Sequence, residues 1–215
     1  MIIPKNWTFK NKDVANSFDS HVREQLPWYD LCTEAIEHIA RQYLSENGLI
    51  YDLGCATGNI NKALNELILE RKAQYIGIDN SKEMIANFKG NGKVELANIN
   101  EFEYQYFDVG ICFLTMMFLP FYEHEAFLNK IVSKIKKGGC LIVVEKCEPK
   151  GGYVSLVLSR LTLREKLKSS TADDIIKKEL SLGGVQRPIR DSLFYAYGAE
   201  FFRFGDFAGW IIENK

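Results

Sequence analysis

Apolar runs and helical stripes alternate through the middle of the chain, and this alternation constrains its fold more than any other feature. Patterns typical of buried strands occur at residues 49–53, 74–79, 94–97, 107–113 and 140–147. Between them, apolar residues recur at helical spacing, as in 60–68 and in 127–135 ahead of Gly138-Gly139. Strands and helices joined by short connections predict a mostly parallel sheet with helices on both faces.

The two ends of the chain depart from this alternation. Residues 1–47 are predicted to form an N-terminal helical cap, and residues 148–190 carry helical patterns but no strand pattern, which indicates a helical insertion. Two apolar runs flank Gly205-Asp206 and predict a closing β-hairpin. We expect residues 1–215 to form a single domain.

Composition excludes several classes of protein. No apolar stretch reaches the ~18 residues of a membrane span, and the beginning MIIPKNWTFKNKD lacks the apolar run of a signal peptide. We therefore expect a cytoplasmic protein that does not bind membranes. A net charge of -1 gives the chain as a whole no attraction to polyanions such as nucleic acid. The five cysteines show no CxxC spacing, so reduced thiols and no metal site are expected.

The turn after the first predicted strand reads YDLGCATGN. Glycines at such a turn let the backbone approach a ligand, whose polar end then meets the N-terminus of the next helix. The second strand ends in Asp79, a carboxylate placed to bind ribose hydroxyls, and Asn98-Ile99 after the third could meet an adenine ring. The fingerprint G-x-G-x-x-G is absent because Ala56 replaces its second glycine, which argues against a nicotinamide dehydrogenase.

Four segments together resemble a known family. YDLGCATGN, YIGIDNSKEMI, FDVGICFLTMMFL and IKKGGCLIVVEK are similar, in order and spacing, to the motifs of class I S-adenosylmethionine (SAM)-dependent methyltransferases. The resemblance implies a Rossmann-like, seven-stranded sheet of order 3-2-1-4-5-7-6 with the seventh strand antiparallel. FDSHVREQLPWYDL, DNSKEMI and the end of the chain resemble the subgroup that includes tRNA uridine 5-oxyacetic acid carboxymethyltransferase.

The resemblance also implies a SAM site. Tyr29 would cover the cofactor with Trp28 as an apolar lid, Asp79 would bind the ribose, and Asn98 departs from the usual aspartate of the third motif. The predicted cofactor-binding residues are Tyr29, Asp52, Gly54, Cys55, Ala56, Gly58, Asp79, Asn80, Met84, Asn98, Ile99 and Phe113.

No catalytic residue is predicted, because transfer from a sulfonium depends mainly on positioning the acceptor. Three side chains near the predicted strand ends are candidates that also have plain structural interpretations: Glu145, Tyr195 and Tyr197. The histidines His21, His38 and His124 lie among charged residues and are predicted to face solvent.

The sequence thus predicts a SAM-dependent methyltransferase acting on a small-molecule or nucleoside acceptor. Two alternatives remain: a tRNA wobble-uridine carboxymethyltransferase that uses carboxy-SAM, and a catalytically silent SAM-binding module. The resembling subgroup has an arginine where Glu179 stands and an asparagine where Phe113 stands, which favours ordinary SAM here. Residues 146–190 hold ten Lys or Arg against five acids, a charge excess that could meet RNA phosphates. The insertion could also contact a second copy of the chain in a homodimer.

Overall fold

The computed structural model describes residues 3–215 and contains one sheet of seven strands in the order β3-β2-β1-β4-β5-β7-β6. The strands are β1 (Leu49–Leu53), β2 (Gln74–Asp79), β3 (Lys93–Leu96), β4 (Phe107–Phe113), β5 (Ile135–Lys146), β6 (Gly198–Phe204) and β7 (Phe207–Glu213). The first five are mutually parallel, and β7 runs antiparallel to both β5 and β6. This arrangement confirms the predicted fold class.

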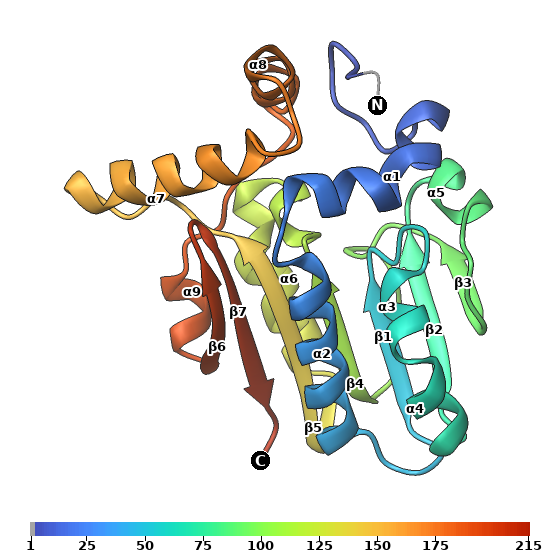
Figure 1. The fold of residues 1–215 in the computed structure, drawn as a ribbon. Helices are drawn as coiled ribbons and strands as arrows, with labels where there is room; N and C mark the ends of the chain where they lie inside the picture. The colour runs from blue at the N-terminus through green and yellow to red at the C-terminus, as the bar shows by residue number, and fades with distance from the viewer. Residues whose placement is uncertain (1–2) are drawn as a thin grey trace.

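Helices cover both faces of the sheet (Figure 1). Their bounds are α1 (Lys12–Gln25), α2 (Tyr29–Tyr43), α3 (Asn59–Ala63), α4 (Asn65–Glu70), α5 (Lys82–Ala86), α6 (His124–Val132), α7 (Gly152–Lys166), α8 (Ala172–Ser181) and α9 (Ser192–Tyr195). Helices α2, α3 and α4 pack on one face, while α6 and α9 pack on the other. Helix α1 passes across the carboxyl ends of the parallel strands, with α8 nearby.

Side chains of the central strands alternate between two apolar cores. Ile50 of β1 and Ile111 of β4 pack with Ile36 of α2 in one core. The neighbouring residues Tyr51 and Cys112 belong to the core on the opposite face, which also contains residues of α6. Successive side chains of a strand point to opposite faces, so strands covered on both sides are apolar throughout.

One predicted helix end is wrong. Helix α6 stops at Val132, whereas the apolar spacing predicted that it continues past Ile135 to Gly138-Gly139. Ile135 instead begins β5 and pairs with Phe107 of β4. Gly138 has a φ of +78° at an irregularity within this strand pairing, so its left-handed backbone serves a strand rather than a helix cap.

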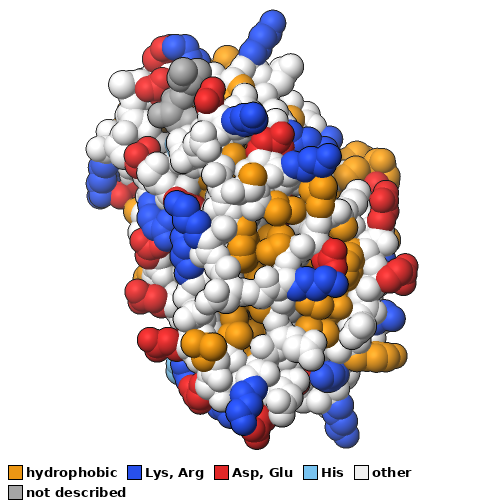
Figure 2. Space-filling view, turned by 90° about the vertical axis from the view of Figure 1, so that its right-hand side faces the viewer, with side chains coloured by type: hydrophobic (Ala, Val, Ile, Leu, Met, Phe, Trp, Pro, Cys, Tyr) orange, Lys and Arg blue, Asp and Glu red, His pale blue; other side chains and the backbone are white. Residues whose placement is uncertain are grey.

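The insertion contains the two helices that the sequence predicts. Helix α8 begins after Thr171, whose hydroxyl accepts a hydrogen bond from the Asp174 N–H, as expected of a capping box. Helix α7 has no buried residue and projects beyond the sheet (Figure 1). None of the helices within residues 3–215 combines the length and apolar character needed to cross a membrane. On one face of the molecule, hydrophobic side chains gather in the middle, with Lys and Arg around them (Figure 2).

Candidate functional site

A cavity of about 230 Å³ lies where the carboxyl ends of the five parallel strands meet. Residues at or just after each strand line it, in the spatial order of the sheet: Ala97, Asn98 and Ile99 after β3, Asp79 and Asn80 at β2, Gly54 and Ala56 after β1, Leu114, Thr115 and Met117 after β4, and Lys146 at the end of β5. Ligands of open α/β sheets bind at this edge. The cavity is therefore long in one direction, along the row of strand ends.

The turn after β1 is shaped by backbone conformations that few residues adopt. Gly54 has a φ of +82°, and a Cβ at this position would overlap with the Thr115 side chain. The N–H groups of Gly54 and Cys55 both donate to the Ile78 carbonyl of β2, at 2.8 and 3.1 Å. Ala56, which replaces a glycine of the family motif, has a φ of +45° and so occupies the left-handed region with a side chain.

Asp79 is held by two backbone donors at the end of β2. One carboxylate oxygen accepts the Ala56 N–H at 2.9 Å, and the other accepts the Ser81 N–H at 2.8 Å. Burial raises the pKa of Asp79, although these N–H donors act in the opposite direction. Each oxygen keeps a lone pair that could accept a hydroxyl, so the carboxylate fits a ribose diol.

Tyr29, at the start of α2, also lines the cavity. Its ring stacks on Phe113 with centroids 4.9 Å apart and planes 17° apart, and burial raises the pKa of its phenol. Trp28 is buried but does not line the cavity. It packs against Phe113, Phe202 and Phe207 and is therefore not placed to act as the predicted lid.

The structure divides the predicted cofactor-binding residues into two groups. Those that line the cavity are Tyr29, Gly54, Ala56, Asp79, Asn80, Met84, Asn98 and Ile99. Asp52, Cys55, Gly58 and Phe113 do not line it.

Of these four residues, Asp52 lies in β1, Cys55 and Gly58 lie in the turn after it, and Phe113 ends β4. Asp52 is buried and accepts a 2.6 Å hydrogen bond from the Tyr75 hydroxyl, and desolvation raises its pKa to about 7. Gly58, with a φ of +88°, starts α3. The Cys55 side chain occupies the space beside Gly77 of β2. Asp52, Cys55 and Gly58 therefore shape the turn after β1 without lining the cavity.

Glu145 is a buried carboxylate of β5 that fixes the loop after β4. It accepts hydrogen bonds from the N–H groups of Thr115 at 2.9 Å, Met116 at 2.7 Å and Met117 at 3.2 Å. Desolvation raises the pKa of Glu145 to about 7 despite these donors. Leu114, at the start of this loop, has a φ of +59° and lines the cavity. Glu145 therefore positions the cavity wall without facing a ligand.

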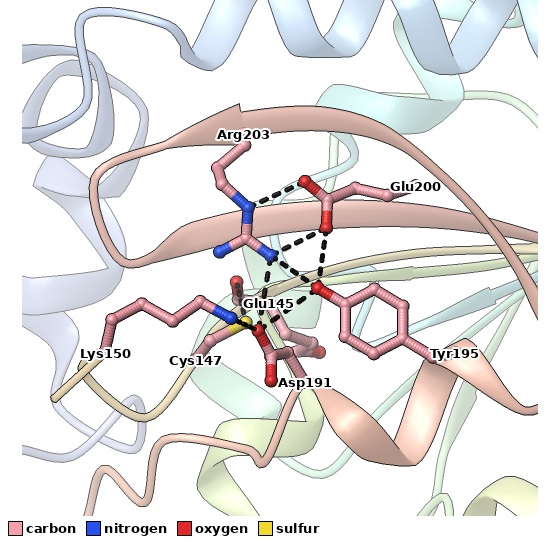
Figure 3. A network of polar contacts seen from close by, with 7 residues as sticks. All are labelled: Glu145, Cys147, Lys150, Asp191, Tyr195, Glu200 and Arg203. Carbon is pink, nitrogen blue, oxygen red and sulfur yellow. Dashed lines mark hydrogen bonds and ion pairs between the residues drawn. The ribbon is translucent and has the colours of Figure 1, made fainter.

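The two candidate tyrosines lie elsewhere. Tyr195 belongs to a polar network in which Arg203 of β6 bonds Glu200 and Asp191, and Asp191 pairs with Lys150 (Figure 3). This network joins α9, β6 and the segment after β5. The hydroxyl of Tyr197 donates to Asn129 of α6. Neither tyrosine lines the cavity, so neither is placed for chemistry there.

Most polar residues at the β5 end of the cavity were not assigned to the site from the sequence. They are His21, Gln25, Lys146, Lys166, Lys178 and Gln186, whereas the neighbouring Glu179 was singled out by the comparison with the resembling subgroup. The prediction that His21 and His124 face solvent is wrong, because both are buried. Burial, with Lys178 close by, lowers the pKa of His21 to about 3. His38 is exposed as predicted.

Groups suited to successive parts of SAM line the cavity in the same order as the strands of the sheet. Asn98 and Ile99 offer an amide and an apolar side chain at one end, and Asp79 offers carboxylate lone pairs beside them. Gly54 has no side chain, which lets the backbone turn approach a ligand. The Tyr29 hydroxyl can donate to a carboxylate. The donors and acceptors present are therefore compatible with the cofactor.

Comparison with known proteins supports this assignment. Residues 44–183 match the family model described as "Methyltransferase domain". A carboxy-S-adenosyl-L-methionine synthase of Staphylococcus epidermidis is 29% identical over 192 residues, which cover 86% of this chain and 84% of that protein. One from Sulfurimonas denitrificans is 32% identical over 151 residues, covering 67% and 63% of the two chains.

Solved structures share the fold. The plantazolicin methyltransferase BpumL in complex with SAH superposes with a TM-score of 0.63 at 13% identity, over 95% of both chains. The DhpI-SAM-HEP complex has a TM-score of 0.60 at 15% identity, over 93% of this chain and 92% of the other. The match over residues 44–183 places the chain in the methyltransferase domain family of enzymes, and the solved structures show that it shares their fold.

Proposed function

We propose that the protein transfers the methyl group of SAM to a small-molecule or nucleoside acceptor that binds at the β5 end of the same cavity. The observation that carries this proposal is the continuity of the cavity from Asn98, after β3, to Lys146, at the end of β5. The groups suited to SAM occupy the part formed by β3, β2 and β1. The part formed by β5 and the insertion is left for a second molecule.

SAM supplies an electrophilic methyl group on a sulfonium, and the protein's task is to bind and orient. In this proposal Asp79 accepts the ribose hydroxyls, Asn98 and Ile99 meet adenine, and Tyr29 donates to the methionine carboxylate. Asp79 is pre-positioned by its two backbone donors, which lowers the cost of ordering on binding.

Apolar side chains also line the cavity, among them Leu26, Leu114 and Phe207. These side chains would exclude water from the acceptor nucleophile and hold it in line with the transferred group. Glu145 supports this arrangement by fixing the loop that carries Leu114. We assign no general base to the reaction.

The names of the relatives favour a second candidate. The Staphylococcus epidermidis protein, similar over 86% of this chain, is a carboxy-SAM synthase, and the second candidate is that this chain makes carboxy-SAM from SAM and a carboxyl-donating co-substrate. Carboxymethyl transfer to a tRNA uridine is the less favoured hypothesis. Phe113, where the resembling subgroup has an asparagine, stacks on Tyr29 and offers no polar group to an added carboxylate.

Mass spectrometry of reaction products tests these candidates. Purified protein would be incubated with SAM and fractionated metabolite or RNA extracts from cells. Formation of SAH together with a methylated product supports the proposal, whereas carboxy-SAM as the product would support the second candidate. A protein that binds SAM but yields neither product would contradict both, and would favour the silent module. The Asp79→Asn variant controls for contaminating enzymes, since it should lose whichever product forms.

A further inference from the structure

The carboxylate of Asp19 joins helix α1 to the turn after β1. Its Oδ1 atom accepts hydrogen bonds from the Thr57 hydroxyl and from the Asn59 amide, the latter at 3.0 Å. Its Oδ2 atom lies 3.8 Å from the Lys62 amine. Within residues 3–215, every hydrogen bond and ion pair between α1 and residues 54–62 includes Asp19.

The two side chains that donate to Asp19 are buried on either side of Gly58. Thr57 is 2% exposed and Asn59 is 8% exposed, and Gly58 between them has a φ of +88°. A buried hydroxyl or amide that loses its partner keeps the full cost of its desolvation. Loss of Asp19 would therefore favour a rearrangement of the turn at Gly58.

Helix α1 and the turn contribute to the same cavity. The lining residues of α1 are Phe18, His21, Val22 and Gln25, and those of the turn are Gly54 and Ala56. The relative position of the helix and the turn thus shapes the cavity. Asp19 does not line it, so this residue fixes that relative position without touching a ligand.

Asn59 also lies close to the hydroxyl of Tyr29. Burial raises the pKa of Tyr29, and contact with the Asn59 side chain acts in the opposite direction. A neighbour lowers the pKa of a phenol by donating to its oxygen, so the Asn59 amide nitrogen faces both Tyr29 and Asp19. An ionised carboxylate only accepts, so Asp19 fixes the orientation of this amide. The phenol proton of Tyr29 then remains available for a ligand.

We propose that Asp19 is a positioning residue of the cofactor site, acting through Thr57 and Asn59 on the part that receives the methionine moiety of SAM. The inference rests on the proposed function, in which Tyr29 donates to the methionine carboxylate. Asp79 accepts the ribose hydroxyls in that function, and within the described part of the chain its carboxylate bonds only to the Ala56 and Ser81 N–H groups. Loss of Asp19 should therefore weaken contacts with the methionine moiety and spare those with adenosine.

Calorimetry with SAH and with adenosine tests the proposal, because SAH carries an amino-acid carboxylate and adenosine does not. We expect Asp19→Leu to reduce SAH affinity at least tenfold and to change adenosine affinity less than twofold. Asp19→Asn should stay within threefold of the parent for both ligands. Its amide oxygen can still accept the two hydrogen bonds that end on Oδ1, and only the contact with Lys62 is lost.

The matched control is Asp13→Leu, in the first turn of the same helix, where Asp13 is exposed. It should bind both ligands as the parent does. Thermal unfolding verifies that each variant folds. If Asp19→Leu does not fold, Thr57→Val takes its place, because it removes one donor to Asp19 and leaves α1 unchanged. This variant should lose at least threefold in SAH affinity and keep its affinity for adenosine.

Unchanged SAH affinity in the folded variant would overturn the proposal. Equal losses for SAH and adenosine would also overturn it, since a purely structural role affects both ligands alike. Asp19→Asn as weak as Asp19→Leu, or Asp13→Leu as weak as either, would contradict the assigned hydrogen bonds. SAH binding to the parent protein is measured first. No binding there contradicts the proposed function, whereas binding that is indifferent to Asp19 contradicts only its positioning role.

Discussion

The carboxylate of Asp79 accepts a hydrogen bond from the N–H of Ala56, with 2.9 Å between nitrogen and oxygen. This contact joins the end of β2 to the turn after β1 and fixes the carboxylate before any ligand arrives. A group held in this way loses little freedom when it binds, so its hydrogen bonds contribute more fully to affinity.

Replacement of Asp79 by asparagine should weaken SAH binding at least tenfold, or about 1.4 kcal/mol. The amide keeps one acceptor oxygen but loses the charge and one of the two acceptors available to the ribose. Isothermal titration calorimetry measures the change, and thermal unfolding verifies that the variant folds. Asp173→Asn, on the exposed face of α8, provides the control and should bind SAH as the parent does. Undiminished affinity in a folded Asp79 variant would remove the residue from the site.

Replacement of Ala56 by glycine should increase the free energy of unfolding by about 1 kcal/mol, because Ala56 holds a φ of +45° that glycine adopts without a steric cost. Urea denaturation followed by circular dichroism gives the value. Ala63→Gly, within α3, should change stability in the opposite direction by a similar amount. A destabilised Ala56 variant would show that the methyl group makes contacts that outweigh the backbone strain.

Removal of the Tyr29 hydroxyl should reduce SAH affinity by about 0.5–1.5 kcal/mol, the usual contribution of one hydrogen bond. Tyr29→Phe keeps the ring stacked on Phe113, so the change isolates the hydroxyl. Calorimetry with SAH and with adenosine tests where the hydroxyl acts. A loss for SAH but not for adenosine is expected, and equal losses would be inconsistent with a contact to the methionine carboxylate. Tyr122→Phe, at an exposed tyrosine, serves as the control.

Asp52 should make the folded protein less stable as the pH rises. Desolvation raises its pKa from 3.8 to about 7, so the folded protein binds the proton more tightly than the unfolded chain. The stability contributed by this group is complete below about pH 4 and is lost as the pH rises to about 7. Asp52→Asn removes the titration and keeps an oxygen for the Tyr75 hydroxyl. Urea denaturation should therefore show the variant gaining stability relative to the parent between pH 5 and pH 7.5. A difference that stays constant over this range would contradict the assignment.

The central strands were predictable because each is buried on both faces and reads as an apolar run, whereas the order of all seven was implied by the resemblance to methyltransferases. Three residues that line the cavity were predictable for a related reason, since Gly54, Asp79 and Asn98 each lie within two positions of the end of a strand. Local pattern is enough when the residues of a site lie at the ends of consecutive strands.

The other end of the cavity was not predictable in this way. Lys178 lies on the second helix of the insertion, and its contacts with Trp7 and His21 span more than 150 residues of sequence. On the sequence it is indistinguishable from Lys177, which faces solvent one position earlier. The prediction of where α6 ends failed for a different reason. The position of Ile135 fits the apolar spacing of a helix and of a strand equally well, and only its pairing with Phe107 decides between them.

The division of the cavity between separate parts of the chain bears on how such an enzyme diversifies. In the proposed function the cofactor binds lining residues from the range 54–99 together with Tyr29, whereas two of the three lysines that line the cavity belong to the insertion between β5 and α9. Changes to that insertion leave the turns after β1, β2 and β3 untouched. Natural variation or laboratory recombination confined to residues 148–190 can therefore alter the molecule that receives the methyl group while the donor stays the same.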